Sequence, residues 1–226
     1  MFVFSPSNMS TFIQCPRKFQ AQSITKEIKW QATQQKSRGT LIHSCMERAL
    51  QKGYDAVSSW PEGMDMDFVK RSVDAARSVT TRDGVELFIE HEMTVNDKWK
   101  STGWWDDDAM LRAKADALIL VPGQHALLLD FKSGKVYDRD CFQLRVEAFL
   151  AHLLYGVSSV SYSYWYVDSA ERVSGSCDFS FGYHQVQDVL DLMQEMRGCI
   201  NGNIFLPKKN RFCKWCQLYK TPGCGL

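Results

Sequence analysis

Two neighbouring strand patterns, joined by a short turn signal, constrain the fold of this chain most strongly. From Ala109 to Val121, apolar side chains alternate with charged ones, and an apolar run from His125 to Lys132 follows Pro122-Gly123-Gln124. A period of two residues is typical of β-strands, and a Pro-Gly pair between two such runs predicts a hairpin. The chain is therefore expected to contain an antiparallel pair whose first strand has one charged face.

A turn centred on Gly123 brings acidic side chains together. It places Asp116 opposite Asp130 and Lys114 opposite Lys132 on one face. Directly opposed residues have β-carbons about 5 Å apart, so two carboxylates there repel unless a proton or a cation lies between them. A hard divalent cation such as Mg²⁺ suits this position. Lys132 projects its ammonium group to the same side, where it can position water or stabilise charge on a phosphoryl oxygen.

These residues also have simpler interpretations. Asp130 and Lys132 can form an edge ion pair beside Ser133-Gly134, and His43, at the edge of an apolar helical stripe, can be a core histidine. A metal site is as well supported as these simpler interpretations only when Asp130 and Lys132 are considered together with the opposed Asp116 and with His43.

The remaining elements alternate along the chain without a linker or a repeat. Helices are predicted near 9–13, 39–51, 68–76, 143–155 and 186–199, and strands near 85–95, 109–121, 125–132 and 160–166. A length of 226 residues is ample for a buried core. One α/β domain is therefore expected.

Composition places the chain among globular proteins. Hydrophobic residues make up 45% and charged residues 23%, which excludes collagen-like, coiled-coil and wholly disordered chains. The net charge is only +1, so a nucleic-acid partner must be held by a local basic patch. Met1–Ser10 has no basic stretch followed by an apolar run, so a cytoplasmic protein without a membrane span is expected.

The eight cysteines are expected to be core residues or metal ligands, because disulfides are rare in a reducing compartment. Cys213-x2-Cys216 and Cys224 place three thiolates in a short basic tail, which suits zinc or an iron–sulfur cluster and leaves unliganded cysteines open. The cysteines within periodic elements are expected to be small core residues: Cys45, Cys141, Cys177 and Cys199.

The order of these motifs is similar to that of a known family. The succession is Ser5-x-Ser7, Cys15-Pro16-Arg17-Lys18-Phe19, Gly39-x3-His43, Arg112-Ala113-Lys114-Ala115-Asp116, Asp130-Phe131-Lys132-Ser133-Gly134-Lys135, Gln143-Leu144 and the terminal cysteines. It resembles the RecB-like PD-(D/E)XK nucleases, above all the iron–sulfur branch found in AddB, in the CRISPR adaptation nuclease and in phage exonucleases. The resemblance covers nearly the whole chain. It implies a single domain over 1–226 with a restriction-endonuclease-like core at about 37–170, in which helices flank a mixed central sheet.

The resemblance also implies roles for site residues. His43, Asp116, Asp130 and the peptide carbonyl of Phe131 are the implied ligands of Mg²⁺ or Mn²⁺. Lys132 is the implied catalytic lysine, and Gln143 would contact the site or the DNA backbone. Two positions depart from the family pattern, with Ala113 in place of Gly and Glu147 in place of Tyr.

For the cysteines, the resemblance implies a [4Fe-4S] cluster that joins the two ends of the chain, with structural zinc as the alternative. Its ligands would be Cys15, Cys213, Cys216 and Cys224, within segments at about 5–20 and 205–226. Gln217 stands where the family has Pro, a minor departure.

Together these features predict a metal-dependent DNA nuclease, an exonuclease rather than an endonuclease, acting in recombination, repair or phage DNA metabolism. Its expected substrate is DNA that is single-stranded or has free ends, and a recombination or replication protein is a candidate partner. The alternative is a non-catalytic DNA-binding or scaffold module. The three mutually costly charges of Asp116, Asp130 and Lys132 argue against it.

Two further groups of residues are candidates for DNA contact. Six basic residues lie near the implied cluster in the sequence: Arg17, Lys18, Lys208, Lys209, Arg211 and Lys214. They are candidates to bind a DNA phosphate backbone, and the alternative is that they are scattered, solvated charges. Trp104-Trp105 is expected to be a packed aromatic pair, with stacking on unpaired bases as the alternative.

Overall fold

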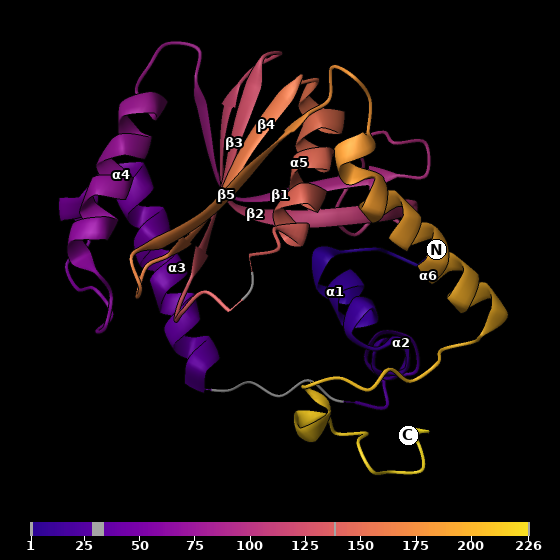
Figure 1. Ribbon diagram of the computed structural model, residues 1–226. Helices are drawn as coiled ribbons and strands as arrows, with labels where there is room; N and C mark the ends of the chain where they lie inside the picture. Colours follow the sequence, from indigo (N-terminus) through magenta and orange to yellow (C-terminus); the bar gives the residue numbers. More distant parts are fainter. Residues whose placement is uncertain (1, 29–33, 138, 226) are drawn as a thin grey trace.

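The chain folds around one five-stranded mixed sheet (Figure 1). The computed structural model describes residues 2–28, 34–137 and 139–225, so both end residues of the predicted domain lie outside it. The strands follow the order β1-β2-β3-β4-β5, and only β3 and β4 run parallel to each other. Their bounds are β1 (Glu86–Asn96), β2 (Ala109–Val121), β3 (His125–Lys132), β4 (Ser159–Tyr166) and β5 (Glu171–Asp178).

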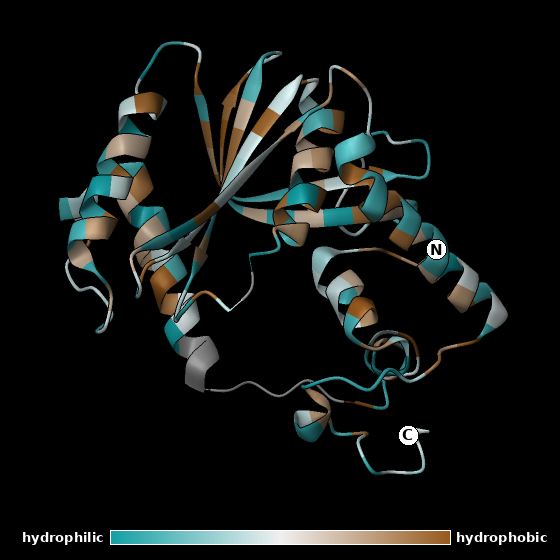
Figure 2. Cartoon of the chain, in the orientation of Figure 1, coloured by the Kyte–Doolittle hydropathy of each residue, from teal (hydrophilic) through white to brown (hydrophobic). Residues whose placement is uncertain are grey.

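Helices cover both faces of the sheet, and each face has its own apolar core (Figures 1 and 2). One core contains Met46 and Val69 from the first pair of long helices, and the other contains Phe149 and Met193 from the second. The α-helices are α1 (Pro6–Gln14), α2 (Pro16–Phe19), α3 (Gln34–Lys52), α4 (Met66–Thr80), α5 (Phe142–Tyr155) and α6 (Gln187–Gly202). Four short helical turns complete the elements: η1 (Gln20–Ile24), η2 (Tyr54–Ala56), η3 (His184–Val186) and η4 (Cys213–Trp215).

Local sequence signals explain where the helices begin and end. Ser5 and Asn8 form a reciprocal capping box at the start of α1, and Pro6 supplies its first residue. Cys15 is extended, and Pro16 after it separates α1 from α2. Gly156 ends α5 in the left-handed region, with φ 64°.

The β2–β3 hairpin has the predicted register. Its ladder runs from Val121 opposite His125 to Ala117 opposite Leu129, with Gly123 in the turn. The ladder ends there, one residue before the two aspartates. The ladder does not extend to the predicted pairing of Lys114 with Lys132; Lys114 forms an ion pair with Glu90 of β1, and Lys132 forms one with Asp130.

Several described elements lack a sequence prediction: α2, η1, η2, β5 and η4. Strand β5 has a weak pattern because Gly175 lies at its centre. A β-carbon at Gly175 would stand 2.7 Å from the ring of Tyr162, so this glycine is needed for the packing of β4 against β5.

The two ends of the described chain are joined by hydrogen bonds. The side chain of Asn210 donates to the carbonyl of Gln14 (2.9 Å), and Arg17 Nε donates to the carbonyl of Gly223 (2.7 Å). In Figure 1 the C-terminal tail accordingly lies beside α1 and α2. No helix in the described ranges is both long enough and apolar enough to cross a bilayer.

Candidate active site

The middle of β2 and the end of β3 bring Asp116, Asp130 and Lys132 together. Asp130 is 2% exposed and Asp116 is 9% exposed. Lys132 Nζ donates to Asp130 Oδ1 at 3.0 Å and lies 2.7 Å from Oδ2. Oδ2 is buried, and the Lys132 ammonium is the charged group beside it. A carboxylate held in this way can also offer an oxygen to a divalent cation.

The two aspartates are linked through the backbone of β3. The peptide N–H of Phe131 donates to Asp116 Oδ2 at 2.7 Å, and the Phe131 side chain is fully buried. This bond ties the Asp116 carboxylate to the β3 backbone directly after Asp130. Asp116, in the middle of β2, and Asp130, near the end of β3, therefore lie together, as the hairpin predicted.

Helix α3 adds His43 to this group. Its Nδ1 lies 3.2 Å from Asp116 Oδ1, and about a third of its side chain is exposed. Burial lowers the pKa of His43, but the hydrogen bond and charge of Asp116 outweigh that effect and raise it. His43 is therefore a partner of a carboxylate and not an isolated core histidine.

Glu90 is a further acidic residue that sequence reasoning missed. One ligand atom each from His43, Glu90 and Asp116 lie within 4.8 Å of one another. Glu90 faces Asp116 because the β1–β2 ladder pairs Ile89 with Ala117 and His91 with Ala115. The long connection between these strands gives no turn rule, so only the ladder itself reveals this neighbour.

Glu47 on α3 also faces this acidic group. Burial raises the pKa of Glu47 to about 7, with the charge of Glu90 as the next cause. The carboxyl groups of Glu47 and Glu90, beside the predicted ligands, thus increase the local negative charge. Such an excess favours a bound cation over solvent alone.

Helix α5 contributes Gln143 and Glu147 on the other side of Asp130. Gln143 Nε2 donates to Asp130 Oδ1 (2.7 Å) and to Glu147 Oε1 (2.9 Å), while its Oε1 accepts from Lys132 Nζ (3.4 Å). The amide is therefore fixed in one orientation, between the two acids and the lysine. Gln143 contacts the site as predicted.

The electrostatics of this cluster follow from burial. Burial raises the pKa of Asp130 to about 6, the Lys132 ammonium opposes this, and the Asp116 charge adds to it. Burial lowers the pKa of Lys132, but the charge and hydrogen bond of Asp130 outweigh it and raise the value, so the amine is protonated at neutral pH. Burial and the Asp130 charge raise the pKa of Glu147 well above its ordinary range.

The four predicted cluster ligands line one small cavity between the chain ends. Cys15, Cys213, Cys216 and Cys224 surround about 20 Å³ of space. The amide of Lys208 donates to Cys15 Sγ (3.3 Å), and the amide of Asn210 donates to Cys213 Sγ (3.2 Å). Among the described residues no three of these sulfurs lie within 4.8 Å of one another.

The other cysteines mostly occupy the core, as expected. Cys45, Cys141 and Cys177 are buried, whereas Cys199 is only half-buried, and all eight are free thiols. The core prediction is therefore wrong for Cys199, which lies near the end of α6 at the edge of the apolar cluster.

The residues predicted to contact DNA are two groups, the basic residues near the four cysteines and the pair Trp104-Trp105. Arg17 is held by Glu27 (2.6 Å), and Lys208 Nζ donates to the carbonyl of Ile13, so neither is a free surface charge. The Arg112 guanidinium stacks on both Trp104 and Trp105. Trp105 is 83% exposed, so the interpretation as a packed aromatic pair is wrong for this residue.

Acids and a lysine on the interior strands β2 and β3, with a histidine from α3, form a site equipped to hold a divalent cation beside a fixed ammonium group. The chain matches the PD-(D/E)XK nuclease superfamily over residues 3–220, and it belongs to that superfamily. Members of this class are nucleases that use divalent metal ions, so the predicted nuclease class is confirmed at this level.

Two solved structures are similar to this chain. The crystal structure of SSO0001 has 13% identity and a TM-score of 0.46, covering 100% of this chain and 88% of that one. The alkaline exonuclease LHK-Exo from Laribacter hongkongensis has 6% identity and a TM-score of 0.37, covering 89% of each chain. A search of the curated proteins finds no match.

Proposed function

We propose that the protein is a Mg²⁺- or Mn²⁺-dependent deoxyribonuclease that removes nucleotides from DNA ends. The observation that carries this proposal is the cluster of two buried carboxylates, Asp116 and Asp130, with the Lys132 ammonium 2.7 Å from Asp130 Oδ2 and His43 Nδ1 3.2 Å from Asp116 Oδ1. The exonuclease preference and the setting in recombination, repair or phage DNA metabolism rest on the motif resemblance.

The donor set fits a hard divalent cation. Asp116, Asp130 and the carbonyl of Phe131 would supply oxygen ligands, and His43 would supply a nitrogen. Glu90 offers one more carboxylate to the same group. When bound, such an ion polarises a phosphoryl oxygen and lowers the pKa of a bound water.

Lys132 and Gln143 act on the reacting groups in this proposal. The raised pKa of Lys132 keeps its ammonium charged, so it donates hydrogen bonds to an oxygen that gains negative charge and does not remove a proton. Gln143 holds Lys132 and Asp130 in one geometry by bonding both. Positioning of this kind costs no reorganisation when charge develops on the phosphate.

We also propose that the four cysteines hold a [4Fe-4S] cluster. Backbone amides already donate to two of the sulfurs, as expected for thiolate ligands. The four sulfurs surround one small cavity, and the preference for an iron–sulfur cluster over a structural zinc rests on the motif resemblance.

A cleavage assay tests the nuclease proposal. End-labelled linear DNA and closed circular DNA, each single- and double-stranded, are incubated with Mg²⁺, Mn²⁺ or a chelator. We expect stepwise shortening of linear DNA with either metal, intact circles and no reaction with chelator. Cleavage of circles would replace exonuclease by endonuclease, and DNA binding without any cleavage would favour the scaffold alternative.

A further inference from the structure

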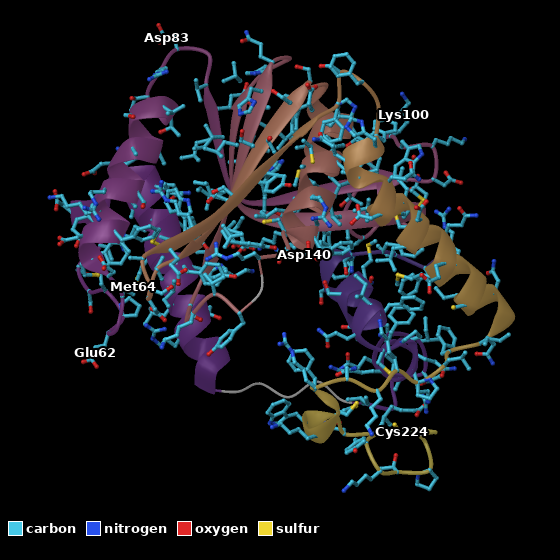
Figure 3. All side chains as sticks on the ribbon, in the orientation of Figure 1. Glu62, Met64, Asp83, Lys100, Asp140 and Cys224 are labelled. Carbon is cyan, nitrogen blue, oxygen red and sulfur yellow. The ribbon has the colours of Figure 1, made fainter. Side chains whose placement is uncertain are left out.

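A groove of about 770 Å³ adjoins the candidate active site. We call it the aromatic groove and define it by Gln143, Tyr164, Arg211, Phe212, Lys214 and Trp215. Asp140, labelled in Figure 3, lies on the side formed by the sheet and α5, and the tail that also carries Cys224 forms the other side. The groove thus lies between the nuclease core and the cysteine-bearing end of the chain.

Large apolar side chains are exposed along this groove. Trp215 is 68% exposed and Phe212 41%, and Tyr137, on the loop after β3, is 84% exposed. Several exposed aromatic rings along one hollow mark a binding surface more strongly than isolated apolar residues do. The two tail rings lie 6.3 Å apart, close enough to serve as neighbouring contact points.

Positive charge accompanies these rings. The Lys214 ammonium lies 4.1 Å from the centroid of Trp215, and the Arg211 guanidinium lies 4.8 Å from that of Phe212. Asp140 is the acid on the opposite wall, and it is paired with Arg145 at 3.0 Å. The tail wall is therefore both aromatic and cationic, a combination that suits bases and phosphates together.

The groove leads directly to the catalytic candidates. Gln143 lines it and also donates to Asp130, while Tyr164 lines it and lies 5.0 Å from the Lys132 ammonium. A polymer lying along the groove would therefore bring its backbone to the residues proposed to act on a phosphodiester.

We propose that the aromatic groove binds a segment of single-stranded DNA, with unpaired bases stacked on Trp215 and Phe212 and phosphates held by Arg211 and Lys214. The bases of a duplex are already stacked on one another, so exposed ring faces select unpaired DNA. This inference rests on the proposed nuclease function, whose substrate class and binding path it specifies.

Equilibrium binding tests the groove separately from catalysis. The probe is a fluorescein-labelled oligothymidylate, followed by anisotropy in chelator so that no metal-dependent cleavage occurs. W215A and F212A should each weaken binding by roughly 5- to 150-fold, the effect of removing one stacking ring. W215F, which keeps a ring, should retain most of the affinity. F181A removes a ring that is 84% exposed in the turn after β5, and it should bind like the wild type.

The salt dependence provides a second readout. K214A should reduce the slope of log affinity against log salt concentration by about 0.7, the value for one phosphate contact on a single strand. A duplex of the same length should show much smaller losses with W215A and F212A. An unchanged affinity in both ring variants, or equal losses for single strand and duplex, would overturn the proposal. So would a change in self-association of W215A with oligothymidylate binding intact.

The outcomes separate this inference from the nuclease proposal. Wild-type protein that binds oligothymidylate through Trp215 but never cleaves DNA would leave the groove assignment standing and remove the nuclease assignment. If the protein cleaves DNA normally and W215A and F212A bind like the wild type, the nuclease assignment stands and the groove assignment falls.

Discussion

The acidic centre and the cysteine-bearing tail are built in opposite ways. Asp116, Asp130 and Lys132 stand on strands whose backbones are fixed by ladders, and α3 and α5 bring further side chains to them. The tail over 205–225 contains only η4 and turns, with exposed rings and several backbone turn bonds. The acidic centre is therefore positioned by the sheet, whereas the tail depends on its few links to the N-terminal segment.

Because the two regions are built differently, substitutions in them should affect different properties. Acids held by a sheet repel one another, so the acidic centre trades stability for a preformed cation site. The tail has little apolar burial, so a bound group at the four cysteines would contribute much of its order. Changes at the acidic centre should affect chemistry, and changes at the cysteines should affect the fold.

Asp116→Asn is expected to have the largest effect on cleavage. Replacing the carboxylate with an amide keeps an acceptor for the Phe131 N–H but removes a charged metal ligand, so cleavage should fall at least roughly 100-fold. Thermal unfolding without metal should occur at the same or a higher temperature, because a repelling charge is lost. Asp74→Asn, on the exposed face of α4, is the matched control. Substantial cleavage by Asp116→Asn would remove Asp116 from the site.

Cys15→Ala is expected to have the next largest effect, on stability. A group shared by Cys15 and Cys213 would close a loop that contains nearly the whole chain, and closing a loop of this length corresponds to about 5 kcal/mol in the chain-entropy picture. Protein purified without oxygen should be brown with about four irons per chain, and Cys15→Ala should lose both colour and thermal stability.

Cys45→Ala is the control for this change, since Cys45 is buried but distant from the tail elements in sequence and fold. It should keep the colour and lose only side-chain packing. One zinc and no iron in the wild type would replace the cluster by a zinc site. Absence of any metal from anaerobic protein would remove the link altogether.

His43→Ala should have a moderate effect on metal affinity. Loss of a ligand should weaken binding at least roughly tenfold, the lower end of what outer-shell partners cost. A high Mn²⁺ concentration should restore metal binding by the variant only in part, because the remaining donors are oxygens. Calorimetric titration with Mn²⁺ measures this, and an unchanged titration would return His43 to a structural role.

Glu147→Gln should have the smallest effect, visible only as a pH dependence of stability. The raised pKa means that the native state holds a proton that the unfolded state, with an ordinary value near 4.5, releases. Wild-type stability should therefore fall as pH rises through the native pKa, whereas the glutamine variant mimics the protonated acid. The variant's advantage in metal-free protein should be absent at low pH and grow toward pH 8.

Unfolding curves across pH 5–8 test this expectation, with exposed Glu195→Gln as the control. A constant difference between Glu147→Gln and the wild type over this range would show that Glu147 is not held protonated.

Much of the fold follows from local sequence patterns. The turn at Gly123 fixes the β2–β3 register, and this register alone brings Asp116 to Asp130. The β1–β2 register depends on a long connection and on packing, so Glu90 could not be placed from sequence. Strand β5 escaped prediction because Gly175 serves a contact with Tyr162 from another strand, which no local pattern records.

The contacts that each side chain makes follow less directly from the sequence than its position in a helix or strand does. The sequence predicted that Gln143 contacts the site, but its simultaneous bonds to Asp130 and Glu147 depend on how α5 packs against β3. Likewise, the exposure of Trp215 and Phe212 beside Gln143 depends on the path of the tail. Neither arrangement has a sequence signature of its own.

The most direct test of the account follows one labelled single-stranded oligonucleotide through three conditions. Wild-type protein receives Mg²⁺, then chelator, then excess Mg²⁺, and Asp130→Asn is treated in parallel. The account predicts cleavage that stops with chelator and returns with Mg²⁺, and no cleavage by Asp130→Asn in any condition. Cleavage that persists in chelator, or that Asp130→Asn performs at the wild-type rate, would contradict a metal-dependent nuclease centred on Asp130.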